Sequence, residues 1–292
     1  MKITIVGGSS FIGSNFVNIF SKRKYEIKYS YFNNSTTFKN GFQLDVNNKE
    51  TIKKFFKNNK SDVVIISTAL TNVDLCETNP KLAELINVKG TQNVIDACKN
   101  LDIKIIYIST SAVFDGNKSK YNEKDKPNPS SVYGITKLKG EKLVMESNNP
   151  YLILRTDQPY GWKEKWQHTN SVLRVIENLE KNQSFNEISN WYNSPTYVSD
   201  FVNSTELLIQ NKLEGIFHVV GSDFINRYEW AQKVAEIFNL NMKLIKKINS
   251  DDLKLPVKRN NVHLSNQKLE KKIEHKMMGI REGLQSMLEE RC

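Results

Sequence analysis

The sequence has little cysteine and no metal-binding pattern. Its three cysteines, Cys76, Cys98 and Cys292, are odd in number and lack Cys-x-x-Cys spacing. This pattern argues against a disulfide framework and against a zinc site. The four histidines show no ligand spacing either. We therefore expect a fold held by a buried apolar core, with no metal.

Long apolar runs are also missing. No run approaches the roughly 20 residues needed to span a bilayer, and the N-terminus enters a strand pattern without signal-peptide features. We expect a cytoplasmic protein with no membrane partner. The formal charge of +10 invites comparison with nucleic-acid-binding proteins, but the lysines are spread along the chain beside heavy use of asparagine. A compositional bias explains this charge better, so we predict no nucleic-acid partner.

Short apolar runs alternate with helical patterns along most of the chain. This alternation predicts an α/β fold with a Rossmann-type doubly wound parallel sheet. We assign residues 1–156, joined by about 196–220, to a dinucleotide-binding Rossmann domain, and residues 157–195 and 221–292 to a smaller C-terminal substrate-binding lobe. The expected strands are Ile3–Val6, Ile27–Tyr31, Val63–Ile66, Ile103–Ile108, Tyr151–Leu154 and Ile216–Val220. The expected helices are Phe11–Phe20, Lys81–Lys99, Val132–Glu146, Ser171–Lys181 and Tyr228–Phe238, with a last one near Ile280–Glu290.

The first strand pattern leads into a glycine turn. Gly7 and Gly13 bracket the turn, and Ser10 stands where Gly-x-x-Gly-x-x-Gly would have its middle glycine. A strand that enters a helix through such a turn presents backbone N–H groups to a pyrophosphate. The turn therefore favours a dinucleotide site.

Two side chains suited to proton transfer lie at the start of a predicted helix. Tyr133 is the only tyrosine in the chain that is followed by a lysine four residues later, Lys137. That spacing is one helical turn, and an ammonium there stabilises the phenolate and lowers the phenol's pKa from about 10. A strand ending in Thr110 precedes the pair by about twenty residues. Such chemistry is useful beside a substrate carbonyl or carbinol.

Several motifs resemble, in their order and spacing, the extended short-chain dehydrogenase/reductases, and among them the dTDP-4-dehydrorhamnose reductase family. They cover nearly the whole chain and comprise the glycine turn and residues 44–46, 67–77, 86–88, 108–116, 133–141, 155–156 and 193–197. The resemblance implies a catalytic triad of Thr110, Tyr133 and Lys137. In that triad, Thr110 polarises a ketone, Tyr133 donates the proton, and Lys137 tunes the phenol and holds the nicotinamide ribose.

The resemblance also implies binding residues. Residues implied for the cofactor are Gly7, Ser10, Phe11, Ile12 and Gly13 at the pyrophosphate, Asp45 and Val46 at the adenine, and Ala69 and Leu70 along the cofactor path, with Tyr133 and Lys137. Residues implied for the substrate are Thr110, Ser111, Asn193, Thr196 and Arg259. Asp45 has a second interpretation as a helix or turn cap, and Asn87 as an internal polar bridge.

The second strand ends in residues 31–34, where an acidic side chain would select NAD. Asn33 stands there with no acid beside it, which favours NADP(H) as the cofactor and leaves NAD(H) as the alternative.

Residues after Thr110 narrow the reaction. The 4,6-dehydratases carry an Asp-Glu pair there, and enzymes that epimerise before reducing carry a cysteine two residues on, whereas this chain has Ser111 and Ala112. Reduction of the 4-keto group of a nucleotide-linked 6-deoxy sugar remains. Ser111 and Ala112 also replace an Asp-Tyr pair common in the reductase family, so the sugar and its nucleotide stay open. A nucleotide-sugar epimerase and a non-catalytic regulatory subunit, like that of methionine adenosyltransferase, are the alternatives. A homodimer is an open question.

Overall fold

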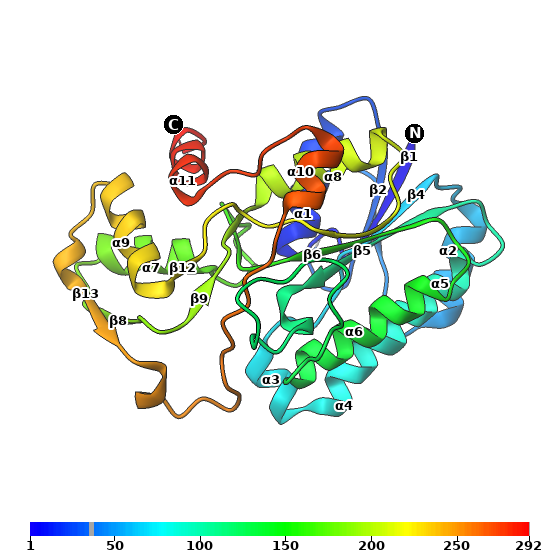
Figure 1. Ribbon diagram of the computed structural model, residues 1–292. Coiled ribbons are helices and arrows are strands. Elements are labelled where there is room, and N and C mark those ends of the chain that lie inside the picture. Colours follow the sequence, from blue (N-terminus) through cyan, green and yellow to red (C-terminus); the bar gives the residue numbers. More distant parts are fainter. Residues whose placement is uncertain (35–37, 292) are drawn as a thin grey trace. The chain divides into compact units, whose positions relative to one another are not determined.

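A seven-stranded sheet organises the computed structural model, which describes residues 1–34 and 38–291 (Figure 1). Cys292 lies outside the described residues. Neighbouring strands pair in parallel wherever register is defined, as between β1, β2 and β4. This confirms the predicted Rossmann-type fold. The strand order is β3 (Gly41–Gln43), β2 (Glu26–Tyr31), β1 (Lys2–Val6), β4 (Val63–Ile66), β5 (Lys104–Thr110), β6 (Tyr151–Thr156) and β11 (Gly215–His218).

The chain divides into two compact units. Unit 1 comprises residues 1–114, 127–155 and 212–217, and unit 2 comprises residues 115–126, 156–211 and 218–292. The assignment of substrate binding to one lobe stays a prediction.

The core of unit 1 follows from continuous apolar strands. All four residues of β4 are buried, as expected for a strand covered on both faces of a parallel sheet. Helices α2 (Lys49–Asn58), α5 (Thr91–Cys98) and α6 (Val132–Met145) lie next to one another along the sheet (Figure 1) and share its apolar core. Helix α1 (Phe11–Ser21) follows β1 and has an apolar buried side.

The helix predicted over 81–99 is a composite. Helix α4 (Pro80–Ala83) continues into a π-helical segment, η1 (Glu84–Gly90), and then into α5, while α3 (Val73–Thr78) precedes them. The side chain of Asn87, within η1, bonds to the backbone of Leu70 outside the helix. π-Helical turns are frequent at functional sites.

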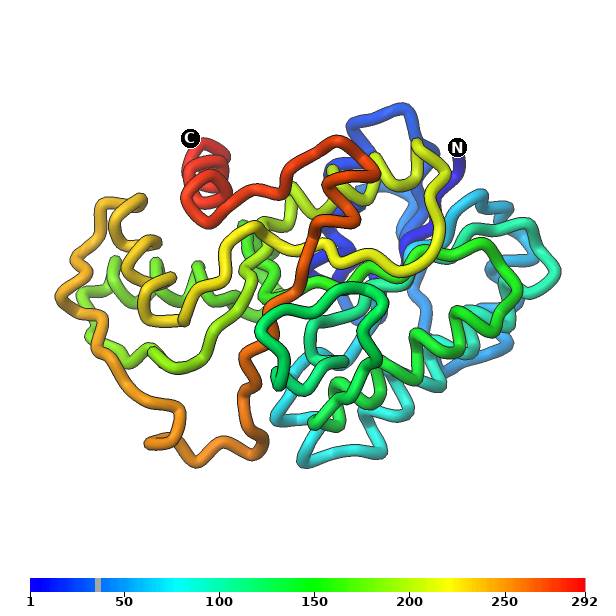
Figure 2. Tube along the Cα trace, in the orientation of Figure 1, coloured from blue at the N-terminus to red at the C-terminus, as the bar shows by residue number. Residues whose placement is uncertain are grey.

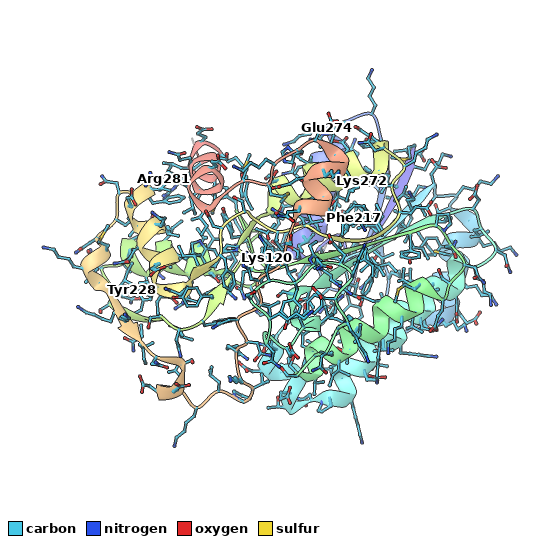
Figure 3. The ribbon with its side chains drawn as sticks, viewed as in Figure 1. Lys120, Phe217, Tyr228, Lys272, Glu274 and Arg281 are labelled. Carbon is cyan, nitrogen blue, oxygen red and sulfur yellow. The ribbon has the colours of Figure 1, made fainter. Side chains whose placement is uncertain are left out.

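Unit 2 has its own apolar core around α7 (Ser171–Glu180), α9 (Arg227–Ile237) and α11 (Ile280–Glu289). Strands β8 (Phe185–Ile188) and β13 (Ile245–Ile248) are far apart in sequence but pair in parallel, and Figure 2 shows them side by side. Arg281 of α11, labelled in Figure 3, donates to Glu236 of α9. The remaining elements of the unit are β7 (Pro159–Tyr160), β9 (Tyr192–Asn193), β10 (Thr196–Tyr197), α8 (Val198–Gln210), β12 (Ile225–Asn226), η3 (Met242–Leu244), η4 (Ser250–Asp252) and α10 (Gln267–Ile273).

Within residues 1–34 and 38–291, no helix is both long and apolar enough to cross a bilayer. The same residues contain no cluster of three or more histidine, cysteine or acidic side chains arranged to hold a metal ion. Cys76 and Cys98 are free thiols, and burial raises their pKa values to about 11 and about 12.

Candidate active site

The turn after β1 is built for close backbone approach. Gly7 has φ +84°, and a Cβ there would lie 2.3 Å from Thr68 Oγ1. A Cβ on Gly13 would lie 2.1 Å from the carbonyl oxygen of Gly7. Both positions therefore require glycine. The turn is held to the next strand, since Ser30 Oγ accepts from the N–H of Gly7 at 3.0 Å.

Ser10 takes the place of the missing middle glycine because it is the N-cap of α1. Its backbone is extended, with φ −70° and ψ 164°, so no glycine is needed. Its hydroxyl accepts from the N–H of Gly13 at 3.1 Å and bonds to Ser67 Oγ at 2.9 Å. The first helical residues, Phe11 and Ile12, are half-buried at the helix N-terminus. Helix N-termini favour anions, so the turn fits the pyrophosphate of a dinucleotide.

Helix α6 carries Tyr133 and begins at a strong cap. Ser131 is the N-cap, and its side chain accepts from the N–H of Gly134 at 3.1 Å. The carboxylate of Glu77, on α3, accepts from the N–H of Val132 at 3.0 Å. An anion at this end of the helix is favoured by the helix dipole. The start of α6 is therefore held by α3 as well as by its own cap.

Two glycines let α6 lie close to β5 and the turn that follows it. A Cβ on Gly134 would lie 2.1 Å from the carbonyl oxygen of Ala112, in η2 (Ser111–Val113). A Cβ on Gly140 would lie 2.1 Å from the hydroxyl of Tyr107. Tyr133 and Lys137 lie on this same helix, so the close packing brings them toward the end of β5.

Lys137 is buried, with 2 % of its surface exposed. Its Nζ donates to the carbonyl oxygen of Ile108 at 2.7 Å and lies 4.0 Å from the centre of the Tyr107 ring. Burial lowers the pKa of Lys137 to about 7, and the negative charge of Glu141 works in the opposite direction. The amine that the spacing predicted as an ammonium is therefore poised between its charged and neutral forms at neutral pH.

Thr110 ends β5 two residues after Ile108. Its Oγ1 accepts from the N–H of Ala112 at 3.2 Å, which uses an oxygen lone pair and leaves the hydroxyl hydrogen to be donated. Tyr133 is half-buried one helical turn before Lys137. The structure thus brings Thr110 and Lys137 to the same end of β5, with Tyr133 on the adjoining turn of α6. Ser111, also predicted, is buried in η2.

Residues predicted along the cofactor path have structural partners. The fully buried Asn87 accepts from the N–H of Leu70 at 2.7 Å and donates to its carbonyl oxygen at 3.1 Å. Its amide also donates to Thr136 of α6 at 3.1 Å. This is the internal polar bridge considered above, and it fixes the loop of Ala69 and Leu70 beside α6.

Asp45 caps a turn. Its Oδ1 accepts from the N–H of Asn47 at 2.9 Å, in agreement with the second interpretation of this residue. Val46 next to it is buried, and its carbonyl oxygen accepts from Asn93 at 2.9 Å. Asn33 is exposed just after β2.

One buried network was not recognised as a site from the sequence. Glu141 of α6, with no exposed surface, accepts from Ser109 Oγ at 2.6 Å and from Arg155 Nε and Nη2 at 2.9 and 2.7 Å. Glu141 and Arg155 appeared in the sequence only as parts of motifs. The spacing of Tyr133, Lys137 and Glu141, four residues each, is the signal that puts all three on one helix face.

Unit 2 contains the other predicted substrate residues. Asn193 is 3 % exposed, and its Oδ1 has no hydrogen-bond partner among the described residues. Thr196 is fully buried, and its hydroxyl donates to the carbonyl oxygen of Asp157 at 2.9 Å. The guanidinium of Arg259 lies 5.8 Å from the ring of Trp191. The pairing of Thr196 within its own unit gives it a structural role.

The fold and the groups of unit 1 define a class: a Rossmann-type dinucleotide-binding protein of the extended short-chain dehydrogenase/reductase kind. Comparison with known proteins narrows this class. A family model described as "RmlD substrate binding domain" matches residues 1–292. The chain belongs to this family, which confirms the resemblance found in the sequence.

Three known proteins are similar to this chain over most of its length. A crystal structure of dTDP-4-dehydrorhamnose reductase from Bacillus anthracis in complex with NADP is similar, with a TM-score of 0.89, 26% identity and 99% of each chain covered. The dTDP-4-dehydrorhamnose reductase of Aggregatibacter actinomycetemcomitans is 29% identical over 230 residues, which are 74% of this chain and 76% of that protein. Methionine adenosyltransferase 2 subunit beta of Xenopus laevis is 30% identical over 233 residues, which are 78% of this chain and 70% of that protein.

Proposed function

We propose that this chain is an NAD(P)H-dependent reductase that acts on the 4-keto group of a nucleotide-linked 6-deoxy sugar. The observation that carries the proposal is the meeting of Thr110 and Lys137 at the end of β5, with Tyr133 one turn away on α6. These are the groups that a carbonyl reduction needs: a donor to the oxygen, a proton source and a cation that tunes it. Family membership and the reductases among the relatives support the same reaction.

In this mechanism the glycine turn and the N-terminus of α1 hold the pyrophosphate, and the loop fixed by Asn87 lines the path of the dinucleotide. The reduced nicotinamide supplies the hydride when it is bound. Thr110 donates its hydroxyl hydrogen to the substrate's keto oxygen as that oxygen gains negative charge. Tyr133 then transfers its phenolic proton to the same oxygen. Lys137, as an ammonium, favours the phenolate left behind.

NADPH is the favoured coenzyme, with NADH as the alternative. The end of β2 carries Asn33, where an acid would repel a 2′-phosphate. A complex with NADP among the similar structures agrees with this choice. Asn193 and Arg259 of unit 2 are the residues we propose for the nucleotide sugar, and the unpaired buried oxygen of Asn193 supports its part.

The test is a panel of nucleotide-linked 4-keto-6-deoxy sugars offered to the purified protein with NADPH and with NADH. We expect oxidation of the reduced coenzyme with at least one dTDP- or UDP-linked substrate. An epimerase would instead copurify with bound NAD and catalyse no net oxidation.

A second candidate function is favoured by the 30% identity to methionine adenosyltransferase 2 subunit beta. A regulatory subunit would bind a partner enzyme and need no proton-transfer groups. A pull-down that recovers one enzyme in stoichiometric amount, from a protein that turns over no keto sugar, would favour this candidate over the reductase.

A further inference from the structure

A fully buried carboxylate lies beside the proposed catalytic groups of unit 1. Glu141 follows Lys137 by one turn of α6 and has no exposed surface. Its two oxygens are held by Ser109, which directly precedes Thr110 in β5, and by the two-point contact with Arg155 near the end of β6. One carboxylate therefore ties together α6, β5 and β6 at the place where the site is built.

The balance of charge around this carboxylate is unusual. An ion without solvent contact is stable only when it is paired and hydrogen-bonded, and Arg155 already provides that for Glu141. Lys137 is a buried amine one helical turn before the same anion on α6. Its own direct contacts are a carbonyl oxygen and an aromatic ring, neither of which carries a full negative charge.

Other ionisable groups around Lys137 are the phenols of Tyr107 and Tyr133 and the carboxylates on the helices that pack against α6. Tyr133 lies on the same helix and Tyr107 on β5, and burial raises the pKa of Tyr107 well above its ordinary value, which keeps it neutral. Among the described residues, Glu141 is the charge that raises the pKa of Lys137 against the effect of burial. The carboxylates on the helices that pack against α6 are Asp74, Glu77, Glu84 and Asp96.

We propose that Glu141 is a positioning residue for the reduction: it anchors the end of β5 through Ser109, and its negative charge, one helical turn from Lys137, favours the ammonium form of that amine. This inference deepens the proposed function and rests on it for the role of Lys137. Apolar pairs of similar volume are often no less stable than buried ion pairs, and the effect on Lys137 gives the pair of Glu141 and Arg155 a role besides stability. Arg155 stabilises the buried carboxylate of Glu141 by ion pairing, and that carboxylate in turn stabilises the ammonium form of Lys137.

The test uses the coenzyme-free protein and needs no substrate. The free energy of unfolding is measured in urea from about pH 5 to about pH 10 for the natural chain and for Lys137→Met, and the difference isolates the titration of Lys137. The same pair is then measured in a Glu141→Gln/Arg155→Met background, which removes the ion pair without leaving a buried charge unpaired. We expect the midpoint of the Lys137 titration to fall by about one pH unit in that background. An unchanged midpoint would overturn the proposal.

Glu141→Asp is the second variant, for the case that the double variant does not fold. It keeps the anion but draws it back by one methylene, so the midpoint should fall in the same direction by about half a unit. A midpoint equal to that of the natural chain contradicts the proposal here as well. The matched control is an exposed ion pair between Lys139 of α6 and Glu84 of η1. The double variant Glu84→Gln/Lys139→Met should leave the midpoint of the Lys137 titration unchanged.

Turnover gives the second readout. If the proposed reduction is correct, kcat should decline about tenfold for each pH unit above the midpoint of the Lys137 titration. A variant that lowers this midpoint should shift the decline in kcat to lower pH by the same amount. A decline that stays in place while the midpoint moves would contradict the link to catalysis. A natural chain that reduces no keto sugar would count against the proposed function, while the titration measured by unfolding would still decide the role of Glu141.

Discussion

At the scale of single residues, Lys137 shows what sequence spacing can and cannot predict. The spacing of four residues correctly puts it on one helix face with Tyr133. Its charge state depends on Glu141, one turn further along α6, and above all on burial in the core of unit 1. No local pattern reports that burial, so the pKa of about 7 was not predictable from the sequence.

We predict that Lys137→Met raises the free energy of unfolding at pH 7, by about 1–3 kcal/mol, while turnover is lost. The folded pKa of about 7 lies below the ordinary 10.5, so the unfolded chain binds more protons between these values. The natural chain should therefore gain stability as pH rises from about 7 to 10.5, and the variant should lack that gain. Urea unfolding across this range measures both, and equal pH slopes for the two chains would contradict the buried amine.

Ser10 and Asp45 show which residue roles do follow from the sequence. The sequence marked Ser10 as a departure from a glycine pattern, and the structure gives it a local cause, the N-cap of α1. It assigned Asp45 to the adenine with a turn cap as the second interpretation, and the hydrogen bond to Asn47 agrees with the cap. Short-range roles of this kind follow from sequence spacing, whereas contacts with a dinucleotide remain predictions.

At the scale of elements, the predicted strands and helices agree with the structure to within a few residues where the apolar period is clear. Residues 81–99 differ in helix type, because they include the π-helical segment η1, and the apolar pattern does not distinguish a π-helical turn from an α-helical one. Helix α2 was not predicted: it buries Ile52 and Phe56, Phe55 packs against the same core, and its other residues are polar. Three apolar residues in a short, lysine-rich segment were overlooked as a helical stripe.

The closeness of α6 to the end of β5 is the element-level feature on which the proposed mechanism depends. We predict that Gly134→Ala lowers stability by about 1–3 kcal/mol, because its Cβ meets the backbone oxygen of Ala112 and no flexible side chain can yield. Turnover should fall as well, since the start of α6 must move away from Thr110. Ile135→Ala, on the exposed side of the same helix, is the control and should change stability by less than about 0.5 kcal/mol. Thermal unfolding and kcat measured on both variants check this, and a Gly134→Ala protein with unchanged kcat would contradict it.

At the scale of the whole molecule, the order of motifs carried more information than any single motif. The glycine turn, Asn87, Thr110 and Tyr133 each have ordinary structural explanations, yet their sequence order predicted the family to which the chain belongs. The parallel sheet follows from the alternation of elements. The substrate could not be predicted in the same way, because Asn193 and Arg259 come from short, irregular segments of unit 2 that carry no periodic signal.

The choice of coenzyme depends on the whole binding surface, and Asn33 is the single position at which we propose to change it. We predict that the natural chain binds NADPH more tightly than NADH. Asn33→Asp should weaken NADPH binding roughly tenfold, since a carboxylate after β2 repels the 2′-phosphate and accepts from the ribose hydroxyls of NADH. Fluorescence titration of both coenzymes gives the two dissociation constants. If the Asn33→Asp protein keeps the same preference for NADPH over NADH, then residue 33 does not lie next to the 2′-phosphate.

The most direct test of the central claim is the turnover of Tyr133→Phe, compared with the natural chain on a nucleotide-linked 4-keto-6-deoxy sugar, with coenzyme affinity measured on the same samples. The phenol is the proposed proton donor, so kcat should fall by about a hundredfold or more while the dissociation constant for NADPH changes little. A Tyr133→Phe protein that reduces the sugar at the natural rate would show that the proton comes from another group.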